Sequence, residues 1–191
     1  MNIDPKEPKK ADRDRFVLSK GHTAPGLYSV LAQRGYFPVE DLKTLRHTGS
    51  YLQGHPDSEA TFQVWICLPD LWDREFLRQL VWRLRGKLDN ADYRVYTLLG
   101  DGEIQEGQVW EAAMLAAHKK LDNLVVIVDN NNLQIDGAID EVNSPYPIDK
   151  KFEAFNFHVI NIDGNDFDQI DAAFKEAKTV KGCPTAIIAK T

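Results

Sequence analysis

Apolar runs and amphipathic stretches alternate along the second half of this chain. Four apolar runs have the length and character of buried strands: 93–99, 124–129, 157–162 and 185–189. Helical spacing of apolar side chains predicts a helix over 108–120. It predicts another after Asp166, which can serve as an N-cap, because Phe167, Ile170 and Phe174 recur at helical intervals. Strands that alternate with helices predict an α/β fold, a parallel sheet with helices on both faces.

The first part of the chain has a helical pattern. Leu27 and Leu31 share one face of a predicted helix over 26–34, and a second short helix is expected over 39–46. We expect no strand before the first of these helices. The length of 191 residues suits one sizeable domain, so residues 1–191 are expected to form a single, partial α/β domain.

The composition is that of an ordinary globular protein, with 43% hydrophobic and 27% charged residues. A net charge of −6 argues against a nucleic-acid-binding surface. No apolar run approaches the ~20 residues that span a bilayer, so no membrane association is expected. Only Cys67 and Cys183 are present, and the polar N-terminus does not resemble a signal peptide. Both observations favour the cytoplasm.

Polar residues follow two consecutive predicted strands at the point where each strand ends. Gly100-Asp101-Gly102 closes the first run, and Asn130-Asn131-Asn132 closes the second. In a parallel sheet the carboxyl ends of neighbouring strands meet at one edge, and open α/β sheets bind their ligands there. We therefore expect these two turns to lie side by side at a binding site.

The oxygens in these turns suit a magnesium ion that holds a diphosphate. Mg²⁺ prefers oxygen ligands in octahedral geometry and shares them with substrate phosphates. Asp101 offers a charged oxygen, Asn131 a neutral one, and Leu133 its backbone carbonyl, while Gly102 lets the backbone approach the diphosphate. Asp-Gly and Asn-Asn are also common turn formers. Their occurrence at two neighbouring strand ends favours the metal site.

Two histidines stand directly after a glycine in a predicted loop. His22 ends Leu18-Ser19-Lys20-Gly21-His22, and His55 lies in Leu52-Gln53-Gly54-His55-Pro56-Asp57. A preceding glycine leaves room for a ligand beside the ring. Each could also be an ordinary surface histidine. The motifs around the two histidines favour the interpretation that they contact a ligand.

These motifs together resemble transketolase. The resemblance rests on Asp14 to His22, Leu52 to Asp57, Gly100 to Gly107 and Asn131 to Gly137. It spans nearly the whole chain and is closest to the N-terminal subunit of transketolases that are split over two genes. In that family this section has the thiamine-diphosphate-binding fold, and the chain resembles it with both ends shortened.

The resemblance implies transfer of a two-carbon ketol unit between sugar phosphates with thiamine diphosphate and Mg²⁺. Asp101, Asn131 and the Leu133 carbonyl would hold the metal. The cofactor-binding residues would be His22, Asp101, Gly102, Asn131 and Ile135. His22 and His55 would be catalytic, since imidazoles near neutral pKa suit proton movements on a hydroxyl. The implied partners are a C-terminal transketolase subunit, which carries the pyrimidine-binding domain, and a homodimer mate.

One stretch, 62–85, departs from the family. It contains three of the four tryptophans, where transketolases carry a glycine-rich loop, Val-Asp-Met-Ser-Thr-Gly-Ser-Leu-Gly-Gln-Gly, and a helix of small residues. Codons for that loop, read from their second base, give every residue from Trp65 to Arg74. Trp82 to Arg85 is likewise a shifted reading of Met-Ala-Leu-Ala.

We interpret 62–85 as a compensated double frameshift. The alternative is a lineage-specific insert with an amphipathic helix through Phe76, Leu80 and Leu84. With bulky residues in place of glycines beside the cofactor, we expect weak or absent thiamine diphosphate binding. Two further functions stay open, a deoxyxylulose-phosphate-synthase-like enzyme, which the motif around His55 disfavours, and a degenerate chain that only pairs with a partner.

Overall fold

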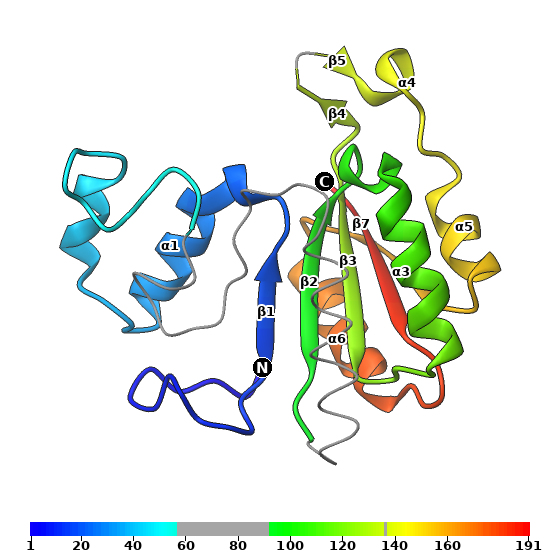
Figure 1. Ribbon diagram of the computed structural model, residues 1–191, viewed down its shortest axis with the longest axis horizontal. Helices are drawn as coiled ribbons and strands as arrows, with labels where there is room; N and C mark the ends of the chain where they lie inside the picture. Colours follow the sequence, from blue (N-terminus) through cyan, green and yellow to red (C-terminus); the bar gives the residue numbers. More distant parts are fainter. Residues whose placement is uncertain (57–91, 136) are drawn as a thin grey trace.

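The computed structural model describes residues 1–56, 92–135 and 137–191. Its centre is a five-stranded parallel sheet in the order β1-β2-β3-β7-β6 (Figure 1). The strands are β1 (Arg15–Leu18), β2 (Val95–Gly100), β3 (Leu124–Asn130), β6 (His158–Asp163) and β7 (Thr185–Lys190). Since all five run in the same direction, their carboxyl ends form one edge of the sheet, as the sequence predicted.

Helices cover both faces of the sheet. Alternate β2 residues point to opposite faces. Val95 and Leu99 belong to the core under α3 (Gly107–His118) and α5 (Ile148–Ala154). Tyr96 instead belongs to the core under α6 (Phe167–Thr179). The predicted α/β class is therefore confirmed.

Helix α3 packs closely because its inner face is made of alanines. Ala112, Ala113 and Ala116 are fully buried against the sheet. A helix with small side chains can approach a sheet closely and still exclude water. This packing fixes the start of α3, and with it the turn that joins β2 to the helix.

The four predicted strands and the two predicted helices of the second half are all present, with ends shifted by one or two residues. Asp166 caps α6 as expected, since its carboxylate accepts hydrogen bonds from the backbone N–H groups of Asp168 and Gln169. The short helix α5 was not predicted from the sequence.

The first part of the chain contains α1 (Ala24–Gln33) and the 3-10 helices η1 (Gly21–Thr23) and η2 (Val39–Thr44). The expectation that no strand precedes the first helix was wrong. β1 pairs in parallel with β2, and Val17 in β1 is fully buried. β1 has only four residues and finds its partner far along the chain, so local periodicity does not reveal it.

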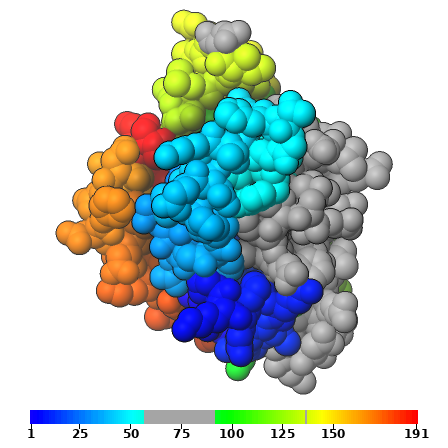
Figure 2. Space-filling model, turned by 90° about the vertical axis from the view of Figure 1, so that its left-hand side faces the viewer, coloured from blue at the N-terminus to red at the C-terminus, as the bar shows by residue number. Residues whose placement is uncertain are grey.

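A lobe projects beyond the carboxyl edge of the sheet. It consists of residues 131–135 and 137–146 and contains β4 (Leu133–Gln134), β5 (Gly137–Ala138) and α4 (Ile139–Val142). β4 and β5 pair as a small antiparallel sheet. In Figure 1 the lobe stands above β3, and in Figure 2 it forms a knob at the top of the molecule.

The atypical stretch 62–85, with its alternative helix through Phe76, Leu80 and Leu84, lies outside the described residues. Within the described ranges, none of the helices is both long and apolar enough to cross a membrane.

Candidate functional site

A pocket of about 210 Å³ opens at the carboxyl ends of β1, β2 and β3. All seven residues that the sequence singled out line it: His22, His55, Asp101, Gly102, Asn131, Leu133 and Ile135. A larger apolar cavity, about 380 Å³, lies beside α1 and β1 and contains none of these residues. The structure thus brings together residues from three separate strand ends, and it leaves none of the seven outside.

Asp101 is the most firmly held of these residues, and it is only 2% exposed. Its backbone N–H donates to the Asp129 carbonyl at 3.2 Å, which ties the turn after β2 to β3. Its two carboxylate oxygens accept the N–H groups of Gly102 at 2.9 Å and Asn132 at 2.7 Å. Burial raises the pKa of Asp101, although these two hydrogen bonds act in the opposite direction. A bound cation would offset the cost of this buried charge.

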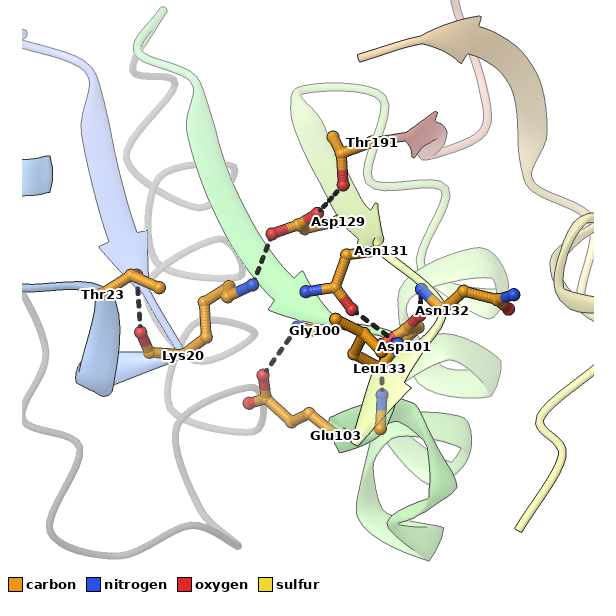
Figure 3. A network of polar contacts seen from close by, with 11 residues as sticks. Lys20, Thr23, Gly100, Asp101, Glu103, Asp129, Asn131, Asn132, Leu133 and Thr191 are labelled. Atoms are coloured by element: carbon orange, nitrogen blue, oxygen red, sulfur yellow. Dashed lines mark hydrogen bonds and ion pairs between the residues drawn. The ribbon is translucent and has the colours of Figure 1, made fainter. Parts of the chain in front are cut away.

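Asn131 lies in a tight turn that its own side chain stabilises. Its side-chain oxygen accepts the N–H of Leu133 at 2.9 Å. The next residue, Asn132, has φ of 64°, a left-handed conformation that asparagine tolerates better than most residues. The turn places Asn131 and Leu133 beside Asp101 (Figure 3).

The ligands present fit a hard cation such as Mg²⁺. Each Asp101 oxygen accepts one backbone hydrogen bond, and a carboxylate has about four lone-pair positions, so two remain. The Asn131 amide oxygen likewise keeps a second lone pair. Among the described residues, no three His, Cys, Asp or Glu side chains lie close enough together to hold a metal ion between them. A metal here would therefore rely on one carboxylate, neutral oxygens and its ligand's phosphates, as Mg²⁺ commonly does.

A side chain at position 102 is disfavoured by the limited space around it, and not by the backbone conformation of Gly102. A Cβ atom at Gly102 would lie 3.2 Å from the Gln134 side chain, which lines the same pocket. Its φ of −69° is open to any residue. A side chain at this position would push Gln134 and narrow the pocket.

The two histidines approach the pocket from the β1 side. His22 lies in η1, directly after β1, and His55 lies in the segment that follows η2. Burial lowers the pKa of His22, and the nearby charges of Lys20 and His55 lower it further. A lowered pKa favours the neutral form of the His22 imidazole at pH 7, the form that can accept a proton.

Two polar braces, which the sequence did not single out, join the strand ends at the pocket. Figure 3 shows the brace from Lys20 through Asp129 to Thr191 and, of the other, the contact between Glu103 and Gly100. Lys20, buried at the end of β1, pairs with the Asp129 carboxylate, which also accepts the Thr191 hydroxyl at 2.6 Å. Ser19 donates to the Glu103 carboxylate, whose other oxygen accepts the Gly100 N–H at 3.1 Å.

These braces fix β1, β2, β3 and β7 relative to one another. Burial raises the pKa of Glu103, and the hydrogen bonds from Ser19 and Gly100 partly oppose this shift. Two signals could have revealed the braces. Lys20 lies within the His22 motif, and Asp129 is a charged residue inside an otherwise apolar strand.

Comparison with known proteins gives a consistent result. Residues 1–67 and 83–191 match the family model described as "Transketolase, thiamine diphosphate binding domain". The gap in this match, 68–82, falls inside the stretch 62–85 that the sequence set apart.

Among curated relatives, a 6-deoxy-6-sulfo-D-fructose transketolase subunit of Clostridium sp. is 42% identical over 191 residues, which are 100% of this chain and 69% of the relative. Human transketolase is 42% identical over 195 residues, which cover 100% of this chain and 30% of that protein. The crystal structure of transketolase from Campylobacter jejuni superposes with a TM-score of 0.90 at 34% identity, over 100% of this chain and 31% of that one.

The chain therefore spans about a third or less of the full-length transketolases and 69% of the bacterial subunit. The motifs at the three strand ends, the parallel sheet beneath them and these matches agree. The chain belongs to the transketolase family and corresponds to its thiamine-diphosphate-binding domain.

Proposed function

We propose that this chain is the diphosphate-binding half of a Mg²⁺- and thiamine-diphosphate-dependent ketol transferase. The observation that carries the proposal is the meeting of Asp101, Asn131, His22 and His55 in one pocket at the ends of three strands. The family match supports the cofactor. The metal and the roles of the individual residues are our inference from their chemistry.

In this proposal Asp101, Asn131 and the Leu133 carbonyl would hold Mg²⁺, whose charge would balance that of the diphosphate. When bound, thiamine diphosphate would supply a nucleophilic ylid carbon and a thiazolium ring that serves as the electron sink for the ketol unit. The chain's own contribution is to position the diphosphate end and to keep Asp101 ionised beside the cation. The buried braces of Lys20 with Asp129 and of Ser19 with Glu103 support this rigidity.

His22 and His55 would handle the substrate. A neutral His22, whose pKa is lowered first by burial, can accept a proton from a sugar hydroxyl. His55 lines the same pocket and is exposed, so it can reach the part of a sugar that lies outside the cofactor. We propose that these two residues orient the hydroxyl groups of the ketose and move its protons.

The site as proposed needs a second chain. In transketolases a glutamate from the pyrimidine-binding domain activates the cofactor, and no residue of this chain is assigned to that role. Two relatives are named as subunits, one of the sulfofructose transketolase of Clostridium sp. and one of an apulose-4-phosphate transketolase of Phocaeicola vulgatus. We infer sugar-phosphate-like substrates and a C-terminal partner subunit, without which we expect this chain to be inactive.

The relatives favour ketol transfer over a deoxyxylulose-phosphate-synthase-like reaction, since each of the named relatives is a transketolase or one of its subunits. They do not select a donor sugar, because the named sugars differ between two relatives of similar coverage. The degenerate, non-catalytic alternative rests on the stretch 62–85 and is decided by activity.

The experiment combines a C-terminal transketolase subunit, thiamine diphosphate and Mg²⁺ with two chains in turn, this chain and the same chain with codons 65–85 read in the family's frame. Ketose phosphates serve as donors and ribose 5-phosphate as the acceptor, and chain-lengthened products are measured. We expect little or no transfer by the first chain, because the bulky residues of 62–85 should weaken cofactor binding. We expect transfer by the second chain that requires the partner subunit and is lost in an Asp101→Ala variant. Condensation of pyruvate with glyceraldehyde 3-phosphate would instead support the synthase-like alternative, and no reaction of either chain with any donor would support the degenerate one.

A further inference from the structure

The lobe begins after Asn130 and ends at Tyr146. The Tyr146 hydroxyl joins these two ends through hydrogen bonds. This oxygen lies 2.6 Å from the Asn130 side-chain oxygen and 2.7 Å from that of Asn132. The two ends of the lobe are thus joined through one hydroxyl group. None of the motifs that identify the family includes Tyr146.

The chemistry of a hydroxyl limits how this contact forms. It has one proton, so it can donate to only one of the two amide oxygens at a time. The other amide is satisfied when it turns its NH₂ group toward the tyrosine oxygen, by a flip about its last side-chain bond. The three side chains then form a continuous chain, in which one asparagine donates to Tyr146 and Tyr146 donates to the other.

These two asparagines flank the proposed metal ligand Asn131. The backbone N–H of Asn132 donates to the Asp101 carboxylate at 2.7 Å, and it does so from a left-handed conformation with φ of 64°. The Tyr146 hydroxyl thus contacts the residues on either side of Asn131, and one of them, Asn132, bonds to Asp101. A contact that holds the Asn132 side chain also holds the backbone that orients Asp101 and Asn131.

Hydrophobic burial contributes little at the start of the lobe, where the Asn130–Asn132 turn lies. Leu133 is 62% exposed and Ile135 is 91% exposed, whereas Ile139 in α4 is fully buried. Hydrogen bonds also hold this part of the lobe, including one from the Ile139 N–H to the Asn132 carbonyl at 2.9 Å and a pair between Gln105 and Gln134. Because the residues that follow the turn bury little apolar surface, each hydrogen bond has a large share in setting the position of the turn.

We propose that Tyr146 is a positioning residue that holds the Asn130–Asn132 turn in the geometry needed to bind a divalent cation. The effect on cation binding rests on the proposed function. The effect on the turn itself does not, and it is measurable without any ligand.

The test compares Tyr146→Phe with Tyr51→Phe in the full chain. Tyr51 is a matched control, because it is 38% exposed against 37% for Tyr146 and its hydroxyl also bonds to a polar side chain, that of Asp41. Amide hydrogen exchange is followed by NMR in the absence of cofactor. We expect the Asn132 and Leu133 amides to exchange about tenfold faster in Tyr146→Phe, with β2 and β3 unchanged, and we expect Tyr51→Phe to match the parent chain.

Two results would overturn the proposal. Unchanged exchange at Asn132 and Leu133 would mean that the hydroxyl does not hold the turn. Faster exchange throughout β2 and β3 would mean that Tyr146 supports the fold as a whole rather than the turn.

A second readout concerns the cation itself. The assembled enzyme for this readout has codons 65–85 read in the family's frame, because the chain as it stands should bind the cofactor weakly. In that enzyme we expect the Mg²⁺ concentration for half-maximal activity to rise three- to tenfold in Tyr146→Phe, with kcat unchanged at saturating Mg²⁺. A lower kcat with the same Mg²⁺ requirement would contradict a positioning role. If that enzyme is inactive without the Tyr146 substitution, the proposed function has failed, and the exchange experiment still decides the role of Tyr146.

Discussion

Two turns supply the proposed metal ligands, and different forces hold them. The turn of Asp101 lies over the core. The carboxylate is 2% exposed, and Ile104, just after it, is fully buried. The turn of Asn131 begins the lobe, where Leu133 and Ile135 are mostly exposed. This part of the lobe is held by hydrogen bonds between side chains, such as those of Gln105 with Gln134 and of Tyr146 with Asn130.

Because the two turns are held by different forces, substitutions that affect the stability of the fold can be told apart from substitutions that affect ligand binding. The Asp101 turn is part of the same packing that holds β2 against α3, so damage beneath it should unfold the domain. The start of the lobe, with Leu133 and Ile135 exposed, contributes little to that packing, so damage there should disturb ligand binding while the fold survives. Substitutions in the two turns should therefore have effects of different kinds.

The largest effect is expected for Ile104→Ala. Removing this fully buried side chain leaves a cavity and should lower the free energy of unfolding by about 2–5 kcal/mol. The matched substitution in the lobe, Ile135→Ala, should change it by less than about 0.5 kcal/mol, because Ile135 is 91% exposed. Urea denaturation of both variants measures this contrast. If both lost the same free energy of unfolding, the two turns would not differ in how they are held.

Asp101→Asn should be next in size, and its effect should fall on binding. Loss of the only carboxylate among the three proposed ligands should weaken Mg²⁺-dependent cofactor binding about 100-fold or more. Asn131→Ala removes a neutral ligand and should cost about tenfold. Calorimetric titration with and without Mg²⁺ gives both values when the substitutions are made in the chain whose codons 65–85 are read in the family's frame. An Asp101→Asn variant that binds as tightly as that chain would show that this carboxylate is not a ligand.

The buried charge of Asp101 also predicts a dependence on pH. Because burial raises its pKa, the folded chain retains the Asp101 proton to a higher pH than the unfolded chain, whose value is near 3.8. Between these two values the folded state binds more protons, so this residue's contribution to the free energy of unfolding falls as pH rises.

Urea unfolding of metal-free parent and Asp101→Asn chains over a series of pH values tests this sign. The variant has no charge to bury, so its stability relative to the parent should increase as pH rises from 3.8 through the raised pKa. A relative stability that stays constant or decreases would show that the Asp101 charge carries no burial cost.

A smaller effect on stability than that of Ile104→Ala is expected for Gln105→Ala. The Gln105 amide bonds to Gln134 at 2.7 Å and to the Asn143 carbonyl at 2.6 Å, so it ties the lobe to the end of β2. Its loss should cost less than about 1.5 kcal/mol overall and speed amide exchange within the lobe alone. Gln169→Ala on α6, which removes the contact with Asp166, is the control and should leave the lobe unchanged.

The sequence predicted much of this site because its parts follow regular strands. Asp101 and Asn131 come directly after long apolar runs, and such runs locate the carboxyl edge of a parallel sheet. The histidines were recognised from the motifs around them. All four residues meet in one pocket.

What the sequence did not predict depends on contacts between distant residues. β1 has four residues, and its burial depends on β2, some eighty positions along the chain. The pairing of Lys20 with Asp129 and the bridge from Tyr146 to Asn130 link residues with no periodic relation. Such contacts depend on how the turns fold back, and hydrophobic periodicity does not encode that.

The central claim is that the ends of β1, β2 and β3 hold the diphosphate of the cofactor through Mg²⁺. It is tested most directly by calorimetric titration of Mg²⁺ and thiamine diphosphate into three chains. These are the parent, a chain whose codons 65–85 are read in the family's frame, and that second chain with Asp101→Asn. We expect weak or absent binding to the parent, micromolar binding to the second chain and none to the third. Micromolar affinity of the parent would refute the role given to 62–85, and binding that is independent of Asp101 and Mg²⁺ would contradict the proposed site itself.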